Sequence, residues 1–487
     1  RTQYVTSGSI EHVINCKGNY HAKEDYDLVI VDEAHNYRHD DSQRFDHLQT
    51  VCKSPCRDRL NNKNRRKKII LISATPLNNH PEDLKNLLSL FQETKRSTLD
   101  GITDLDTYFA RPIKEYNEIM RQRGDLSPNE LTQRVKKIYD KLRNDIIEQI
   151  TIRRTRHNIQ NYKDYLDDLN KNNIKFPDIE PPYEWKYRLN DKLAQLYRET
   201  VIVLTEQLDY TRYRAIEHLV PPFDSEYSEN ARLIAKNLAG IYRINMIKRL
   251  ESSFCAFKRS LKTFLDITQG MIDMYHADKV VILGGRDNTL RKLQNEGLEL
   301  DEILRKLEEK GKLKDNCFPQ KAFKKEFIQL LENDRRILID LQAKWQTVDE
   351  DPKLDLFIEK LHSELFDTNL NQTGKLVVFS ESVDTVNYLA EQLKDRFKEK
   401  KLIAVTSQNR DSKTDTISAN FDANVRKDEQ KDDYQIVISS DVLSEGVNLH
   451  RSHLIVNYDS PWNATRLMQR IGRVNRIGSV SDKIRNY

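Results

Sequence analysis

Apolar and polar residues alternate in two different ways along this chain. In residues 1–110, short apolar runs such as Leu28–Val31 and 69–72 are separated by longer polar stretches. This pattern predicts short buried strands that alternate with helices, as in a parallel sheet. Residues 111–350 instead carry apolar residues at helical spacing, and residues 351–487 return to the first pattern.

The middle region is expected to form a largely helical insertion or bridge. It is rich in Lys, Glu, Arg, Leu and Ile, and its only strand-like run lies at 280–283. Several of its apolar residues fit one face of a helix: Leu233, Ile234, Leu238, Ile241, Tyr242 and Ile244.

The last region predicts four strands, at 375–379, 402–406, 435–439 and 453–457, with a helix at 382–398. The predicted fold class is therefore α/β, with one parallel-sheet lobe in 1–110, a second in 351–487 and a large helical insertion between them.

Composition and charge restrict the class of protein. The chain has 487 residues, of which 38% are hydrophobic and 32% charged, and its net charge of +4 is compatible with nucleic-acid binding. No apolar run approaches the roughly 20 residues that span a bilayer, so we expect no membrane partner. Five cysteines in so long a chain do not suggest a disulfide framework, which favours a cytoplasmic location. The chain starts at Arg1 and not at Met, so we expect a fragment of a longer protein.

The segment 32–35, Asp-Glu-Ala-His, directly follows the first predicted strand. Acidic residues at the carboxyl end of a parallel strand are well placed to hold a metal-bound phosphate. We assign Asp32 to Mg²⁺, Glu33 to the metal and to the attacking water, and His35 to coupling with the next motif. The alternative is that the acidic pair only caps the following helix.

The segment 73–76, Ser-Ala-Thr-Pro, follows the second predicted strand. Its hydroxyl groups, on Ser73 and Thr75, could hydrogen-bond to His35 and so sense the nucleotide site. Taken alone, the same residues also fit a turn or a helix cap.

The segment 439–449 follows a strand of the second lobe and contains Ser444, Glu445, Gly446 and Asn448. A glycine here permits close approach of the backbone to a phosphate or another ligand. An ordinary strand–turn–helix junction is an equally good explanation of these residues taken alone.

The segment 469–478, Gln-Arg-Ile-Gly-Arg-Val-Asn-Arg-Ile-Gly, is the strongest signal. Arg470, Arg473 and Arg476 are three residues apart and are expected to share one helical face. Planar guanidinium groups suit phosphate oxygens and the charge that develops in phosphoryl transfer. The alternative is a solvated basic helix face.

Together these four motifs resemble those of the superfamily 2 helicases and translocases, in particular the bacterial members of the Swi/Snf-type branch. Further segments carry this resemblance: 73–79, 152–155, 248–253 (Lys-Arg-Leu-Glu-Ser-Ser), 351–354 (Asp-Pro-Lys-Leu) and 457–463 (Asn-Tyr-Asp-Ser-Pro-Trp-Asn).

The resemblance implies two RecA-like lobes of the P-loop NTPase class, with ATP and Mg²⁺ as cofactors. It implies that Asp32 and Glu33 bind Mg²⁺ and activate water, and that Arg473 and Arg476 act as arginine fingers. Nucleotide-binding and coupling roles are implied for the remaining motif residues: His35, Ser73, Thr75, Glu445, Gly446, Gln469 and Arg470.

One expected motif is absent from the sequence. No Gly-x-x-x-x-Gly-Lys-[Ser/Thr] phosphate-binding loop occurs in residues 1–487. The family has this loop upstream of the Asp-Glu-Ala-His motif. We therefore expect the parent protein to hydrolyse ATP and this chain alone to be inactive.

Two basic segments are candidates for nucleic-acid contact. Residues 57–68 hold seven basic side chains and could touch a phosphate backbone, or could form a solvated loop. Residues 210–214, Tyr-Thr-Arg-Tyr-Arg, could stack on bases, although core packing explains them better.

The leading hypothesis is the motor region of an ATP-dependent translocase on double-stranded DNA, bound through backbone contacts. The alternatives are a strand-separating RNA or DNA helicase and a non-catalytic nucleic-acid-binding scaffold. The sequence does not identify a protein partner, which could be a polymerase, a nuclease or a restriction component.

Overall fold

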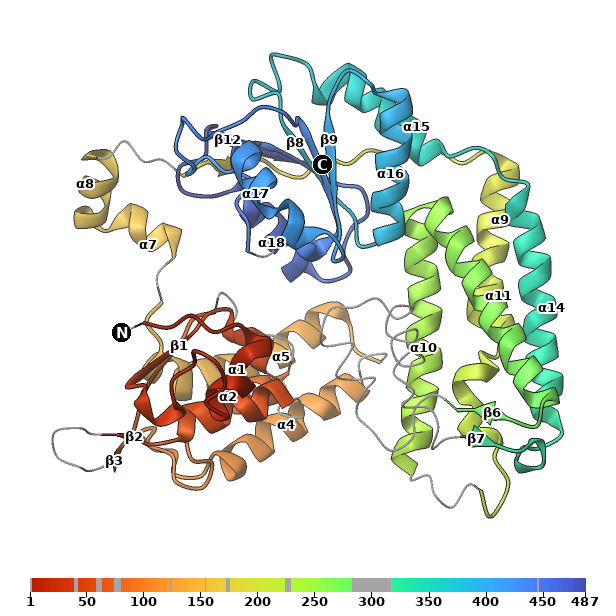
Figure 1. Cartoon of the computed structure of the whole chain (residues 1–487), viewed down its shortest axis with the longest axis horizontal. Helices are drawn as coiled ribbons and strands as arrows, with labels where there is room; N and C mark the ends of the chain where they lie inside the picture. Colours follow the sequence, from red (N-terminus) through yellow and green to blue (C-terminus); the bar gives the residue numbers. More distant parts are fainter. Residues whose placement is uncertain are drawn as a thin grey trace. The chain divides into compact units, whose positions relative to one another are not determined.

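The computed structural model describes residues 2–38, 43–57, 64–73, 80–122, 125–153, 155–171, 176–223, 229–282, 317–444 and 446–487. Contacts between Cα atoms divide the described chain into two compact units (Figure 1). Unit 1 holds the described residues up to Asn158, and unit 2 holds those from Ile159 onward.

Unit 1 contains a pair of parallel strands, β1 (Leu28–Val31) and β4 (Lys68–Leu71). Leu28 lies opposite Lys68 and Val31 opposite Leu71, so the two strands end at the same edge. One face of this pair packs against α1 (Ile10–Ile14), α2 (Gln43–Lys53) and α3 (Pro81–Ser89). Both strands were predicted from their apolar runs.

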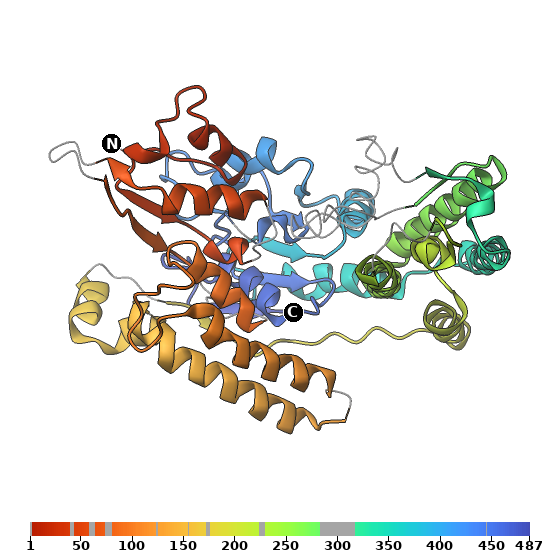
Figure 2. The same cartoon turned by 90° about the horizontal axis from the view of Figure 1, so that it is seen from below.

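The rest of unit 1 is a small hairpin and a helical hairpin. Strands β2 (Cys56–Arg57) and β3 (Asn64–Arg65) pair antiparallel. Helices α4 (Leu105–Arg121) and α5 (Pro128–Leu142) lie side by side, which Figure 2 shows in orange tones. Helix α5 begins with a capping box in which Ser127 and Glu130 satisfy each other's backbone N–H groups. Short helices follow, at α6 (Glu148–Ile150) and α7 (Arg156–Asn161).

Unit 2 contains a six-stranded parallel sheet, in the order β5-β12-β11-β8-β10-β9. The four predicted strands are present within one residue of their expected bounds: β8 (Leu376–Phe379), β9 (Leu402–Val405), β10 (Ile436–Ser439) and β11 (Leu454–Asn457). Two strands were missed, β5 (Asp178–Ile179) and β12 (Lys483–Asn486). The first is too short to give a pattern, and the second mixes charged and apolar residues as lateral strands do.

Helices cover both faces of this sheet. Alternate residues of β8 point to opposite faces, and Leu376 and Val378 pack with α15 (Pro352–Lys360) and α16 (Val383–Arg396). Val377 and Phe379 pack on the other face with α17 (Arg410–Phe421) and α18 (Ala464–Val474). The predicted helix 382–398 is thus confirmed as α16. With parallel sheets in both units, the expected α/β fold class of two RecA-like lobes is confirmed.

A helical bundle makes up the rest of unit 2, drawn in yellow, green and teal in Figure 1. Its helices are α9 (Asp191–Ile202), α10 (Glu229–Ser252), α11 (Phe254–His276) and α14 (Glu326–Gln346). The short helix α8 (Lys163–Lys171) precedes it in the chain. The strand-like run at 280–283 forms the two-residue strand β6 (Val280–Val281), which pairs antiparallel with β7 (Cys317–Phe318).

The region 111–350, expected as one helical block, is shared between the two units. All of α4 and α5 belong to unit 1, whereas α9, α10, α11 and α14 belong to unit 2. Of the apolar residues expected on one face of this helix, Ile241 and Ile244 are 40% and 43% exposed, whereas Leu238 and Tyr242 are buried. The buried face of α10 carries Leu238, Ala239, Tyr242, Met246 and Leu250.

Candidate nucleotide site and arginine helix

Asp32 and Glu33 lie at the carboxyl end of β1. Asp32 is exposed, and its Oδ1 accepts a hydrogen bond from the Glu33 N–H at 2.9 Å. Glu33 has the left-handed backbone φ 48° and ψ 47°. This conformation costs an L-residue about 1–2 kcal/mol, and such strain is typically found at functional sites.

Tertiary hydrogen bonds hold this turn in place. The N–H of Ala34 donates to the carbonyl of Ile72 at 2.9 Å, and the N–H of Asn36 donates to the carbonyl of Glu33 at 3.0 Å. Ala34 begins the short 3-10 helix η3 (Ala34–Tyr37). The acidic pair is therefore positioned by the β1–β4 strand ends and does not cap a regular α-helix.

His35 connects the two strand ends of unit 1. Its Nδ1 lies 3.3 Å from a carboxylate oxygen of Glu33 and 3.5 Å from the hydroxyl of Ser73, which follows β4. His35 is buried, with 7% of its surface exposed. The contact expected between His35 and Ser73 is present, whereas Thr75 lies outside the described residues.

The oxygen ligands at this strand end suit Mg²⁺. Within the described ranges, no group of three or more His, Cys, Asp or Glu side chains could hold a metal ion. Mg²⁺ is commonly held by one or two carboxylates, with waters and substrate phosphates completing its octahedron. Asp32 and Glu33 fit that pattern.

Gly446 has a backbone conformation that favours glycine. Its φ is +77°, and a Cβ built on it would lie 2.5 Å from Nη2 of Arg410. A side chain here would therefore meet both backbone strain and a guanidinium group. Asn448 donates from Nδ2 to Asp422 at 2.9 Å. Glu445 lies outside the described residues.

The three arginines of 470–476 do not share one helical face, so that prediction is wrong. Arg470 is completely buried in α18, and Arg476 follows the end of the helix at Val474. Arg473 and Arg476 are half-buried. Their side chains reach the carbonyls of Val447 at 3.4 Å and Gly472 at 3.2 Å, respectively. Gln469 is half-buried on the same helix.

Arg470 is held by acidic and amide groups of its own unit. Its Nε donates to Asp441 Oδ1 at 2.6 Å, and its Nη1 donates to Asn457 Oδ1 at 3.1 Å and to the Asp459 carbonyl at 3.2 Å. Sequence reasoning missed both aspartates. Asp459 lies in the segment 457–463, but the sequence pattern alone does not indicate that it contacts Arg470.

The two basic segments behave differently. In 57–68, Arg65 pairs with Asp27 at 2.5 Å and Lys67 donates to the Ser54 carbonyl at 2.7 Å, while 58–63 lie outside the described residues. In 210–214, core packing is confirmed. Tyr210 and Tyr213 are buried, and their rings contact Tyr242 and Phe264.

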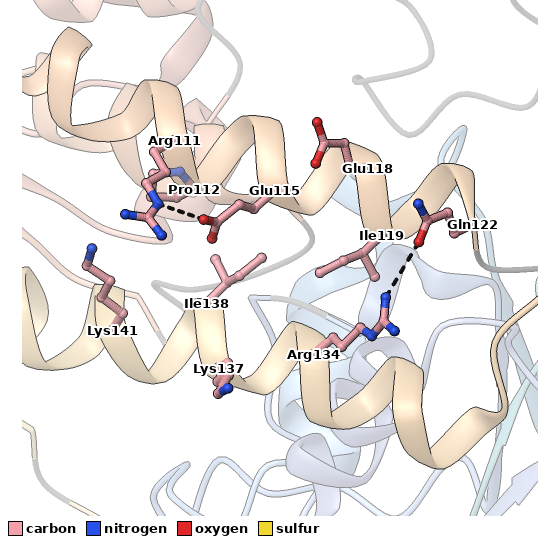
Figure 3. Close-up of a pocket in the computed structure, with 10 residues that line it drawn as sticks. All are labelled: Arg111, Pro112, Glu115, Glu118, Ile119, Gln122, Arg134, Lys137, Ile138 and Lys141. Atoms are coloured by element: carbon pink, nitrogen blue, oxygen red, sulfur yellow. Dashed lines mark hydrogen bonds and ion pairs between the residues drawn. The ribbon is translucent and has the colours of Figure 1, made fainter.

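A cavity of about 540 Å³ opens between α4 and α5 in unit 1 (Figure 3). Arg111 pairs with Glu115 at 2.7 Å, and Arg134 donates to Gln122 at 3.5 Å within it. None of the motif residues lines this cavity, so we do not assign it to the nucleotide.

Two protein-family models match the chain. Residues 3–177 match the SNF2-related domain, and residues 356–478 match the helicase conserved C-terminal domain. The chain thus contains an SNF2-related domain and a helicase conserved C-terminal domain, which agrees with the resemblance that its motifs carry.

Curated relatives match over shorter segments. An uncharacterized ATP-dependent helicase, YqhH of Bacillus subtilis, is 43% identical over 61 residues, which cover 12% of this chain and 11% of that protein. The ATP-dependent RNA helicase FAL1 of Candida albicans is 30% identical over 115 residues, covering 24% of the chain and 26% of that protein. The chain thus spans about a tenth to a quarter of the curated relatives it matches.

Two solved structures are similar to this chain. The C-terminal part of the Fun30 ATPase domain is 15% identical, with a TM-score of 0.28, and the match covers 64% of this chain and 85% of that structure's chain. The Hef helicase domain of Pyrococcus furiosus is 17% identical, with a TM-score of 0.35, and the match covers 99% of this chain and 74% of that structure's chain.

No helix among the described residues is both long and apolar enough to cross a bilayer.

Proposed function

We propose that this chain is the motor region of a cytoplasmic, ATP-dependent translocase on double-stranded DNA. The observation that carries the proposal is the placement of Asp32 and Glu33 at the carboxyl end of β1 in an SNF2-related domain. That strand end is where an α/β domain binds a metal-bound phosphate.

Each motif residue has a role in this proposal. Asp32 would hold Mg²⁺, and Glu33 would orient and deprotonate the attacking water. Bound Mg²⁺ would neutralise charge on the β and γ phosphates. Arg473 and Arg476 stabilise the charge that develops on the γ-phosphate. His35 and Ser73 report the state of this site to β4, because they join the two strand ends.

Glu445, Gly446 and Gln469 belong to the second lobe's share of nucleotide binding and coupling. Gly446 supports this role through its φ of +77°, which lets the backbone turn sharply beside Arg410. Thr75 would extend the Ser73 contact in unit 1.

The phosphate-binding loop is proposed to lie in another part of the parent protein. Parallel sheets normally bury both faces. Yet one face of the β1–β4 pair exposes Leu28, Ile30, Ile70 and Ile72 by 43%, 57%, 47% and 50%. Further elements of the parent protein would cover these side chains and supply the lysine and backbone amides that bind phosphates. Measurable ATPase activity of the 487-residue chain alone would contradict this proposal.

Nucleic acid is proposed to bind through its phosphate backbone. Binding would show little sequence preference and a steep loss of affinity as salt rises. A salt-insensitive, sequence-specific affinity would contradict it.

A strand-separating RNA or DNA helicase is the second candidate. It is favoured by the similarity to an RNA helicase, at 30% identity over 115 residues. The full-length protein should be tested on RNA and DNA duplexes and on a triplex displaced by translocation. Triplex displacement without duplex unwinding supports the translocase, and unwinding supports the helicase.

The ATPase assignment is tested with the full-length protein and double-stranded DNA. Glu33→Gln should lower turnover about 10²-fold or more, as loss of a general base does. Glu118→Gln, at an exposed carboxylate of α4 in the same unit, should have no effect. Equal turnover in Glu33→Gln and the wild type would remove Glu33 from its proposed role.

A further inference from the structure

Three sequence segments that the proposed ATP chemistry does not use meet at one place in unit 2. They are 248–253 at the end of α10, 351–354 at the start of α15, and 457–463 after β11. Ser252 of the first segment donates to the carboxylate of Asp459 in the third, and Lys353 of the second donates to the carbonyl of Ser252. Asp459 is 9% exposed. We name this place the α10 joint.

The end of α10 binds Asp459 directly. The hydroxyl of Ser252 donates to Oδ2 of Asp459 at 2.5 Å, and the hydroxyl of Ser380 donates to the same oxygen at 2.6 Å. The N–H of Glu381 donates to Oδ1 of Asp459 at 2.7 Å. Lys353 closes the end of the helix, because its Nζ donates to the carbonyls of Glu251 at 2.7 Å and Ser252 at 2.9 Å.

Asp459 in turn contacts α18 through Arg470. Nη2 of Arg470 lies 3.9 Å from Oδ1 of Asp459, and Nη1 donates to the carbonyl of Asp459 at 3.2 Å. Both residues are buried, so neither charge can be compensated by water. Moving the end of α10 therefore disturbs the carboxylate that orients Arg470.

A second route runs along the surface of the joint. Lys248 pairs with Glu381 at 3.3 Å, and the other oxygen of Glu381 lies 3.6 Å from Arg466 of α18. Arg466 also pairs with Asp441 at 3.0 Å, the residue that binds Arg470. Lys248 additionally lies 5.1 Å from the ring centroid of Trp462, just before α18.

Both routes begin at α10 and end on the helix that carries Arg473. We propose that the helical bundle positions α18 through the α10 joint, with Lys248, Ser252 and Asp459 as positioning residues. A displacement of α10 would thereby change how α18 presents its arginines. The role of α18 in this inference rests on the proposed function, whereas the mechanical link does not.

The mechanical link is tested by hydrogen exchange on the 487-residue chain. Lys248→Gln removes an ion pair that leads to α18. Arg259→Gln is the matched control, because Arg259 also joins the bundle to the sheet lobe, through Asp384 of α16 at 3.1 Å, but reaches no residue of α18. Ser252→Ala is the buried variant. Ser260→Ala is its control, because the buried Ser260 hydroxyl has no partner in the described part of the chain.

The amides of α18 should exchange at least about fivefold faster in Lys248→Gln and Ser252→Ala, and at the wild-type rate in both controls. Wild-type exchange of α18 in Lys248→Gln, with the end of α10 exchanging faster, would overturn the proposal. Lys248→Gln stays informative if Ser252→Ala does not fold, because Lys248 is a partly exposed side chain.

A second arm measures ATP turnover of the full-length protein with DNA. Lys248→Gln should lower kcat about three- to tenfold and leave the KM for ATP within twofold, while Lys248→Arg restores kcat. An unchanged kcat would overturn the functional part of the proposal. If the wild-type protein hydrolyses no ATP, the proposed function fails, and the exchange result still decides the mechanical link.

Discussion

Nε of Arg470 donates to Oδ1 of Asp441 over 2.6 Å, although no surface of Arg470 is exposed. The arginine belongs to a motif whose guanidinium groups were expected to reach a phosphate. Its neighbour Arg473 is half-buried at the edge of α18. One arginine of the motif therefore packs inside the second lobe, whereas Arg473 and Arg476 are only half-buried.

Arg470→Met should destabilise unit 2 by about 3–5 kcal/mol, because it removes the cation beside the buried Asp459 carboxylate and the hydrogen bonds to Asn457 and to the Asp459 carbonyl. All three tryptophans, Trp185, Trp345 and Trp462, lie in unit 2. The urea midpoint followed by tryptophan fluorescence therefore reports this unit. Arg476→Met is the control and should change the stability by less than about 1 kcal/mol. A midpoint that is equally low in both variants would show that Arg470 has no special structural role.

Arg473→Ala and Arg476→Ala should lower ATP turnover of the full-length protein about 10³-fold or more, as removal of an arginine finger does. Their urea midpoints should stay close to that of the wild type, since both side chains are partly exposed and neither is buried as Arg470 is. Turnover at the wild-type rate in either variant would remove that arginine from the proposed transition-state role.

Glu33→Gly should separate stability from activity. Residue 33 has a left-handed backbone conformation, which glycine adopts without a Cβ clash. This gain in the folded state offsets the greater conformational entropy that glycine gives to the unfolded chain. Thermal unfolding of unit 1 is expected at an unchanged or slightly higher temperature, within about 1 kcal/mol of stability. ATPase activity of the full-length protein should be lost. A marked loss of stability would show that Glu33 holds the fold through its contact with His35.

The stability of unit 2 should fall as the pH drops below about 6.5, the ordinary pKa of histidine. Burial lowers the pKa of His450 and His453, and Arg476 lowers that of His450 further, while Asp422 opposes the shift. The folded state therefore binds fewer protons than the unfolded state. The stability that these two histidines contribute is fully present above their pKa in the unfolded state. It is lost as the pH falls through their lower pKa values in the folded state.

His453→Gln tests this assignment, with urea midpoints at pH 7.5 and 5.5 as the measurement. The ring of His453 lies 2.9 Å from the Leu370 carbonyl at Nε2 and 3.3 Å from the Thr373 hydroxyl at Nδ1, which suits a neutral imidazole. Glutamine offers a donor and an acceptor but does not titrate. The variant should lose part of the pH dependence, and an unchanged dependence would assign it to other groups.

Local pattern was sufficient for the strands that the site depends on. Leu28–Val31 was predicted as it stands, because a short apolar run bounded by polar residues has few other structures. The contact between His35 and Ser73 was also predicted from the sequence, because the ends of adjacent parallel strands meet at one edge of a sheet. The strand β12 was not predicted, because its sequence Lys-Ile-Arg-Asn contains no continuous apolar run.

The sequence by itself determined the α/β class, the SNF2-type motifs and the residue types that ATP chemistry needs. Only the tertiary structure decided that Arg470 points inward and that Ser252 reaches Asp459, 207 residues further along the chain. The physical reason is that a three-residue spacing sets the angle between side chains on a helix, and not the direction of the core. That direction depends on which distant carboxylates pack against the helix, and no local pattern encodes it.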